Sequence, residues 1–222
     1  MSETDEDEQR SPRHGRFGML HLWSSTLAGV VALGISLYNL STLRESPQID
    51  ATLPHLLRIG QGENVYLFLQ PTISVRHKTQ DVDVVTSVRL DLRPDGQAAP
   101  AERPRFFWDD SITWELNRKT GGLDYVHAED PAPLVINQDN PQQPIMSFVA
   151  KDSNLTAGRY LGTLTLYRAS RREPLTEEFC LTVSGDDLKA FATPGKDPYF
   201  IFRNDDPDSV DRHADCYVRF RY

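Results

Sequence analysis

From residue 44 onward, apolar and polar residues alternate with a period of two in short segments, which is the pattern of β-strands with one buried face. In the clearest segment, 82–93, six residues fall on the predicted buried face: Val82, Val84, Thr86, Val88, Leu90 and Leu92. Similar patterns occur at 64–70, 106–116, 145–151, 160–168 and 179–184. Turn residues rich in Pro, Gly, Asn and Asp separate the segments. The pattern predicts an all-β domain, an antiparallel sandwich or barrel, over residues 44–185.

One of these strands is preceded by a pattern with a known structural role. Leu155 and Gly158 lead into Tyr160, at the start of a late strand. This arrangement resembles the tyrosine corner of immunoglobulin-like and fibronectin-type β-sandwich domains, in which the tyrosine hydroxyl bonds to upstream backbone. The resemblance implies an immunoglobulin-like antiparallel β-sandwich, although the Cys-Trp-Cys core of antibody domains is absent. The alternative is that Tyr160 is an ordinary strand aromatic.

Residues 186–222 follow this domain and are expected to form a C-terminal extension packed on the sandwich. A short helical turn is predicted at 187–192, and two further strands at 199–203 and 216–222. Phe179, Leu181 and Val183 share one face of their strand, so Cys180 points the other way, where an added strand could meet it. In an oxidising compartment we therefore expect Cys180 to form a disulfide with Cys216 rather than both being free thiols.

A different pattern occurs near the N-terminus, where residues 18–40 contain no Asp, Glu, Lys or Arg. A helix of this length covers about 34 Å, which is enough to cross a hydrocarbon core of about 30 Å. No Ala-x-Ala cleavage site follows it, as a cleaved signal peptide would require. We expect a single transmembrane signal-anchor helix at 18–43; a buried core helix is the alternative.

Basic residues near the helix ends set the expected orientation. Arg10, Arg13 and Arg16 precede the span, whereas Arg44 and Arg58 follow it. This bias predicts a cell-membrane protein with a cytoplasmic, disordered tail at 1–17 and an extracytoplasmic C-terminal domain. Ser25, Gly29, Ala32 and Ser36 provide small residues four apart, a spacing that lets two membrane helices approach closely. A homodimer or contact with another membrane helix through these residues is therefore expected as one option.

Composition narrows the class of function without naming a reaction. The 222 residues carry 24 Lys and Arg against 32 Asp and Glu, a net charge of -8, which disfavours nucleic-acid binding. The six histidines lack metal-ligand spacing, and no nucleophile or phosphate-binding motif occurs. Residues 204–215 resemble a calcium loop, but Ser209 stands where such loops require glycine and Arg212 where they require an oxygen ligand. We therefore expect no metal and no cofactor.

Aromatic residues provide the remaining candidate site. Trp108 and Trp114 are a candidate binding platform, although a role in the core is the simpler expectation. Asp109, Asp110 and Glu115 lie among them and could in principle serve glycoside hydrolysis, which uses paired carboxylates. No partner group is specified, so no catalytic residue is assigned and no enzyme is expected.

Together these patterns predict a single-pass membrane-anchored protein that presents an extracytoplasmic β-sandwich for binding a protein or a surface polymer. Two alternatives remain open: an accessory subunit of a larger membrane complex acting through its anchor helix, and a cell-surface hydrolase.

Overall fold

The computed structural model describes residues 15–43, 47–76, 82–96, 104–119, 121–193, 199–205 and 216–220. The chain divides into two compact units, Met1–Glu45 and Ser46–Tyr222. The first unit contains the helix α1 (Gly15–Leu43). The expected cytoplasmic tail lies outside the described residues, apart from the first turn of α1.

Helix α1 is apolar around its whole circumference. Its side chains are described over 26–41, and all of them are exposed. Its exposed large apolar side chains include Leu27, Val30, Val31, Leu33, Ile35, Leu37 and Leu40. Among the residues that the structure describes, no helix is long and apolar enough to cross a membrane.

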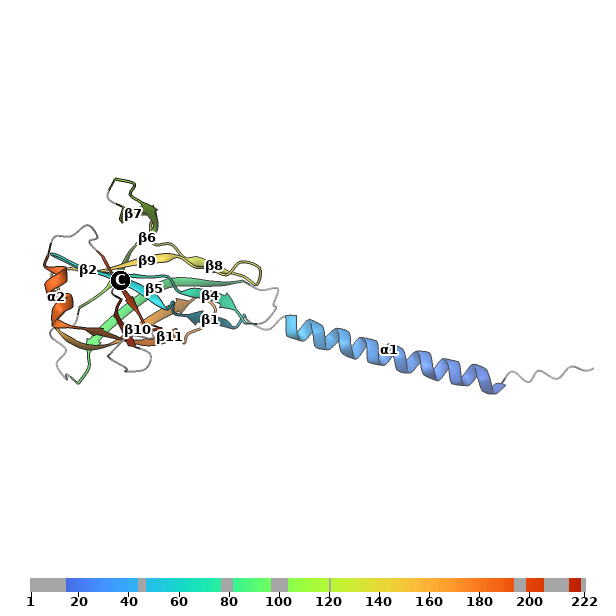
Figure 1. The fold of residues 1–222 in the computed structure, drawn as a ribbon. Helices are drawn as coiled ribbons and strands as arrows, with labels where there is room; N and C mark the ends of the chain where they lie inside the picture. The colour runs from blue at the N-terminus through green and yellow to red at the C-terminus, as the bar shows by residue number, and fades with distance from the viewer. Residues whose placement is uncertain are drawn as a thin grey trace, which may run out of the picture. The chain divides into compact units, whose positions relative to one another are not determined.

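The second unit is mostly β-structure, with one short helix among its described elements, which confirms the all-β prediction (Figure 1). Its described elements are β1 (Ile49–Thr52), β2 (Leu56–Gln61), β3 (Val65–Leu69), β4 (Thr72–Val75), β5 (Asp83–Pro94), β6 (Phe107–Leu116), β7 (Leu123–Glu129), β8 (Leu134–Ile136), β9 (Ile145–Ala150), β10 (Gly158–Arg168), β11 (Leu175–Val183), α2 (Gly185–Phe191), β12 (Phe200–Arg203) and β13 (Cys216–Arg219). The large sheet has the order β7-β6-β9-β3-β2-β12-β13-β11-β10-β5-β8, and β1 pairs separately with β4.

The large sheet curls so that its two halves enclose one core. Leu57, Leu67 and Phe148 from β2, β3 and β9 belong to the same buried cluster as Leu90 and Leu164 from β5 and β10. Eleven of the thirteen described strands thus form one continuous sheet, and an immunoglobulin-like sandwich of two separate sheets is not shown among the described residues. The halves join where β13 pairs parallel with β11 and antiparallel with β12.

The expected domain boundary at residue 185 needs correction. β12 and β13 are central strands of the sheet, between β2 and β11, and not an extension packed on a finished domain. The alternating pattern identified both strands, but it carries no information on which strands they pair with. The short helix predicted at 187–192 is confirmed as α2, whose first turn is closed by a capping box between Ser184 and Asp187.

Strand β5 also departs from its predicted face. Val88, Leu90 and Leu92 are buried as expected, but Val82 is 52% exposed and Asp83 and Val85 are buried instead. The change occurs because Thr86 is an extra residue in the pairing with β10, where Tyr167 pairs with Ser87 and Arg168 with Val85. A β-bulge of this kind moves every residue beyond it to the opposite face.

The Cys180–Cys216 disulfide is present, which confirms the pairing expected from the face of Cys180. The two residues are direct partners in the parallel β11–β13 ladder, with Cα atoms 4.6 Å apart. Phe179, Leu181 and Val183 point into the core on the other face of β11. The disulfide therefore fixes the strand pair at which the two halves of the sheet join.

Candidate binding surface

The outer face of one half-sheet carries a second apolar layer. Leu67 and Phe148 point into the core, while Phe68 and Val149, their neighbours along the chain, point outward. Phe68, Val149 and Ile112 are nevertheless only 3% exposed. The rings of Trp114, Tyr125 and Tyr199 contact Phe68, and Tyr66 contacts Tyr199. These five residues are the aromatic surface.

Phe68 lies at the centre of the aromatic surface. Its ring centroid is 5.2 Å from that of Trp114, 6.1 Å from that of Tyr125 and 4.7 Å from that of Tyr199. Trp114 and Tyr199 meet Phe68 edge to face, at 67° and 78°, which is a favourable arrangement for aromatic pairs. Burial, reinforced by Tyr125 and Tyr66, raises the pKa of the Tyr199 hydroxyl above its usual value. Tyr125 remains 45% exposed, so the cluster is open at that side.

A pocket of about 310 Å³ adjoins the aromatic surface. It is lined by Pro54, His55, Leu56, Arg58, Phe68, Gln70, Trp114 and Ile145. The Arg58 guanidinium lies 4.6 Å from the centre of the Trp114 ring, a cation–π distance. At the rim, His55 Nδ1 lies 3.0 Å from Asn204 Oδ1, and the Gln70 amide donates to the Gln143 carbonyl at 3.2 Å. The lining of the pocket thus combines apolar side chains with hydrogen-bonding groups.

The structure does not bring Trp108 and Trp114 together, so the predicted platform of these two residues needs correction. Asp109 is an extra residue between Trp108, which pairs with Phe148, and Asp110, which pairs with Ser147. This bulge reverses the faces that the even spacing predicts. Trp108 packs against the core and donates from Nε1 to the Asp110 carbonyl at 3.0 Å, whereas Trp114 faces outward.

The structure does not bring the candidate carboxylates Asp110 and Glu115 together, because both follow the bulge and their odd spacing places them on opposite faces of β6. Asp110 faces outward and lies 2.9 Å from His127 Nδ1, while Glu115 is on the opposite face of β6. Ligand atoms of Asp110, His127 and Asp130 lie within 4.8 Å of one another, a set that could hold a divalent cation. Asp130 is 95% exposed, however, and His127 is 54% exposed, so the set lies on the surface. The calcium-loop-like segment extends through 206–215, outside the described residues.

Tyr160 is buried and its hydroxyl bonds to backbone four residues upstream. The Thr156 N–H donates to it at 2.8 Å, and the hydroxyl donates to the Thr156 carbonyl at 3.0 Å. Gly158 lies between the two residues, at the first position of β10. The bonds fix the loop that enters β10.

Tyr160→Phe is expected to lower the free energy of unfolding by about 1–2 kcal/mol, because it leaves both Thr156 backbone groups without this partner. Urea unfolding followed by tryptophan fluorescence measures the change. Tyr167→Phe is the matched control, because Tyr167 is 39% exposed, and its effect should stay within about 0.5 kcal/mol. Equal effects of the two substitutions would show that the bonds to Thr156 contribute no stability.

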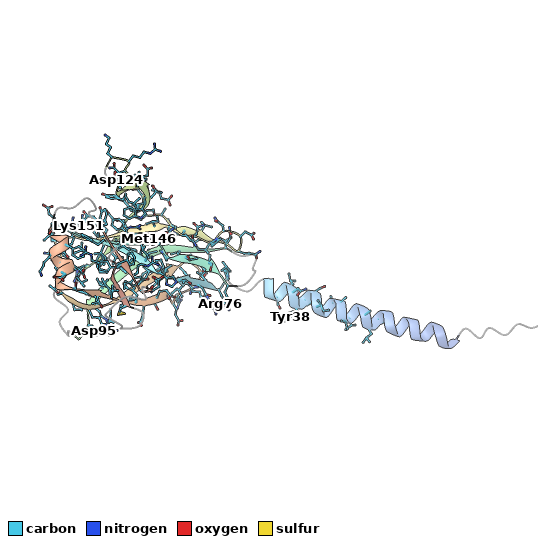
Figure 2. The ribbon with its side chains drawn as sticks, viewed as in Figure 1. Tyr38, Arg76, Asp95, Asp124, Met146 and Lys151 are labelled. Carbon is cyan, nitrogen blue, oxygen red and sulfur yellow. A yellow bond between two sulfur atoms is a disulfide. The ribbon has the colours of Figure 1, made fainter. Side chains whose placement is uncertain are left out.

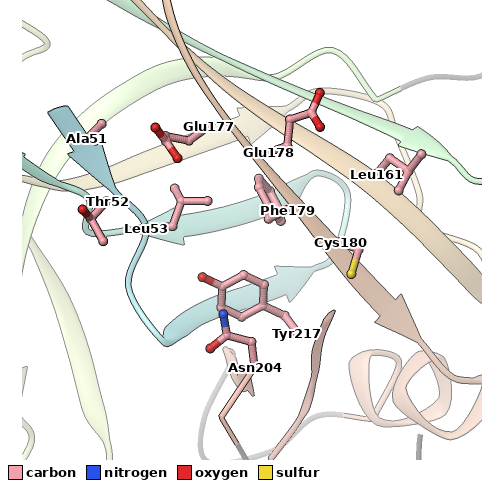
Figure 3. Close-up of a pocket in the computed structure, with 10 residues that line it drawn as sticks. All are labelled: Ala51, Thr52, Leu53, Leu161, Glu177, Glu178, Phe179, Cys180, Asn204 and Tyr217. Atoms are coloured by element: carbon pink, nitrogen blue, oxygen red, sulfur yellow. The ribbon is translucent and has the colours of Figure 1, made fainter. Parts of the chain in front are cut away.

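A second pocket, of about 470 Å³, opens beside the disulfide (Figure 3). Glu177 and Glu178 lie on one side of it, and the Phe179 and Tyr217 rings form part of its wall. Burial, followed by the nearby charge of Asp50, raises the pKa of Glu177. These groups do not form a set of converging donors and acceptors, so the pocket is a weaker candidate than the aromatic surface.

Sequence reasoning identified Trp114 but missed the residues around it. Tyr66 and Phe68 are two apart in the predicted strand 64–70, which places both on one face, and this was the available signal. Arg58, Tyr125 and Tyr199 come from segments whose position depends on the sheet order. Three of the expected helix-contact residues are exposed in α1: Gly29, Ala32 and Ser36. The side chain of Ser25 lies outside the described part of the chain.

Comparisons with known proteins do not assign a family. No protein-family model and no curated protein sequence matches the chain. A solved family 123 glycoside hydrolase from Clostridium perfringens resembles part of it, with a TM-score of 0.34 and 10% sequence identity. The likeness covers 61% of this chain and 27% of that one, so this chain spans only a fraction of the hydrolase. A likeness this weak carries no argument about activity.

Proposed function

We propose that the protein is a single-pass, membrane-anchored binding protein whose extracytoplasmic β-domain holds a protein partner on the aromatic surface. The observation that carries this proposal is the second apolar layer on the outer face of the sheet. An antiparallel sheet with one face on the core usually presents polar residues on the other. Here that outer face carries five clustered rings and a pocket.

The chemistry of the aromatic surface favours a protein partner over a surface polymer. Trp, Tyr and Arg are the residues that contribute most to protein–protein binding energy, and Trp114, Tyr125 and Arg58 supply all three. A sugar ring needs an open aromatic face on which to pack flat. The Arg58 guanidinium covers one face of Trp114, and the other rings meet mostly edge to face.

The anchor and its orientation are supported by the sequence around α1. Residues 18–40 lack charged side chains, and basic residues cluster on the N-terminal side. The Cys180–Cys216 disulfide is consistent with an oxidising compartment for the β-domain. Reporter fusions at each terminus test this part separately, and a cytoplasmic C-terminus would overturn it.

Site-specific photo-crosslinking in the native host tests the aromatic surface. A benzoylphenylalanine at Tyr125 of the full chain is expected to give one discrete adduct with a protein other than a second copy of this chain, which Trp114→Ala reduces at least tenfold. The same probe at Tyr167, another exposed strand tyrosine, is the matched control and should not give that adduct. Adducts that are equal at both positions, or an adduct carrying only carbohydrate, would overturn the protein-partner proposal.

An accessory subunit of a membrane complex is a second candidate, favoured by the all-round apolar surface of α1. Gly29→Leu tests it cleanly, because a Cβ at Gly29 meets nothing within 4 Å in the chain itself. If the helix binds a membrane partner, this substitution should abolish co-purification of that partner while leaving the Tyr125 adduct unchanged. Unchanged co-purification would argue against a contact through this face of the helix.

A further inference from the structure

The two edges of the large sheet differ in how well they are protected. At one edge, β8 is only three residues long and follows Pro131 and Pro133. At the other edge, β7 spans seven residues, all of them exposed, and contains neither Lys nor Pro. The β6–β7 hairpin projects from the body of the domain, as the position of Asp124 shows (Figure 2). Soluble proteins usually shield such an edge with a short strand, a Lys or a Pro, because an open edge pairs with another strand.

The hairpin geometry shows which backbone groups of β7 are open. The Asn117 N–H donates to the Gly122 carbonyl at 2.9 Å, so this pair is hydrogen-bonded across the hairpin. Pairs alternate along an antiparallel ladder, which makes Asp124 and Val126 the next residues bonded to β6. The N–H and C=O groups of Leu123, Tyr125 and His127 therefore point away from β6, toward the edge with which no described strand pairs.

We propose that β7 pairs antiparallel with β7 of a second copy of this chain, with the two Val126 residues facing each other at a two-fold axis. In this register Tyr125 of each copy forms a hydrogen-bonded pair with His127 of the other. These are the residues whose backbone groups point outward. The pairing therefore gives the outward N–H and C=O groups of β7 hydrogen-bond partners, and it leaves the hydrogen bonds between β7 and β6 unchanged.

The charged residues at the two ends of the hairpin favour antiparallel pairing of two copies over parallel pairing. Arg118 and Lys119 lie exposed in the turn, while Glu129 and Asp130 lie exposed at the opposite end of β7. An antiparallel arrangement brings the basic turn of one copy toward the acidic end of the other, twice per dimer. A parallel arrangement would bring like charges together.

The dimer joins the two aromatic surfaces into one outer face, because Tyr125 belongs both to the aromatic surface and to the proposed contact. The inference does not depend on what the aromatic surface binds, since it concerns the chain alone. It is also distinct from a dimer through α1, which leaves β7 open.

A single cysteine at the proposed axis provides the first test. Val126→Cys in the full chain, purified in detergent, places two thiols across a non-hydrogen-bonded pair, where Cα atoms lie about 4.5 Å apart and a disulfide can form. Both native cysteines are already paired, so the new thiol has no native competitor. Mild oxidation should give mostly covalent dimer. Val135→Cys on β8, 52% exposed, is the control and should remain monomeric; equal crosslinking at both positions, or none at 126, would overturn the proposal.

Charge reversal provides a second test that does not alter the backbone. With Val126→Cys in both chains, Arg118→Glu/Lys119→Glu and Glu129→Lys/Asp130→Lys should each lower the crosslinking rate several-fold, because like charges then meet at both ends. Mixing the two variants should restore the rate, because opposite charges meet again. A mixture that crosslinks no faster than either variant would overturn the register. His127→Pro, which removes an outward N–H, should also lower the rate at least tenfold without unfolding the domain.

Discussion

Replacing Cys180 and Cys216 by alanine is expected to lower the free energy of unfolding by about 4 kcal/mol. The disulfide spans a sequence separation of 36 residues, and the chain-entropy model gives about this value for a loop of that size. The position of the bond adds to its effect. β13 pairs with β11 only at Cys180–Cys216 and Leu181–Tyr217, so little else holds the two halves of the sheet in register there.

Urea unfolding of the oxidised protein, the reduced protein and the Cys180→Ala/Cys216→Ala variant measures this effect. Reduction and substitution should give similar losses, because both remove the same crosslink. The single variant Cys180→Ala also breaks the bond but keeps the Cys216 side chain. Its difference from the double variant therefore measures the loss of side-chain packing at Cys216. A loss below about 1 kcal/mol in both the reduced protein and the double variant would show that β13 is held by its other contacts.

Raising the pH above 10 is expected to cost about 2 kcal/mol of stability by pH 12, because of Tyr217. Its side chain is almost fully buried, and its hydroxyl donates to the Pro54 carbonyl. Burial, followed by the charge of Asp205, raises the pKa of Tyr217 to about 12. An unfolded tyrosine ionises near pH 10. The contribution of Tyr217 to the free energy of unfolding is therefore fully present below pH 10 and is lost as the pH rises toward 12.

Urea unfolding of the wild type and of Tyr217→Phe at several pH values between 8 and 12 tests this linkage. The variant should be less stable at pH 8, because it lacks the bond to Pro54, but its stability should fall less steeply above pH 10. Tyr167→Phe, at an exposed position, should retain the wild-type slope. Identical slopes in the wild type and Tyr217→Phe would show that another group controls the alkaline transition.

Burial on one face imposes a period of two on the sequence, and this pattern identified eight of the thirteen described strands; it missed β1, β2, β4, β7 and β8. Val88, Leu90 and Leu92 show this directly. The pattern failed at Thr86 and Asp109, because a β-bulge depends on hydrogen bonds to the neighbouring strand and not on local composition. β7 was missed because all its residues are exposed, so burial imposes no alternation on its sequence.

The candidate site was predictable only in part. The disulfide followed from the face of Cys180, which is a local property of its strand. The aromatic surface depends on which strands are neighbours: Tyr199 precedes β12, and Phe68 lies in β3, yet their rings are 4.7 Å apart. Contacts between segments this distant in the chain are set by sheet order, which alternation does not encode.

The place of β13 in the sheet has a consequence for the order of folding. β13 connects the two halves of the sheet, yet along the chain it comes after every other described strand. During synthesis, β2, β3, β9 and the hairpin of β10 and β11 can pair before residue 216 has left the ribosome. The two half-sheets can join only when β13 is available, so their edges stay unpaired until then. A chaperone that shields these edges should therefore raise the yield of native protein.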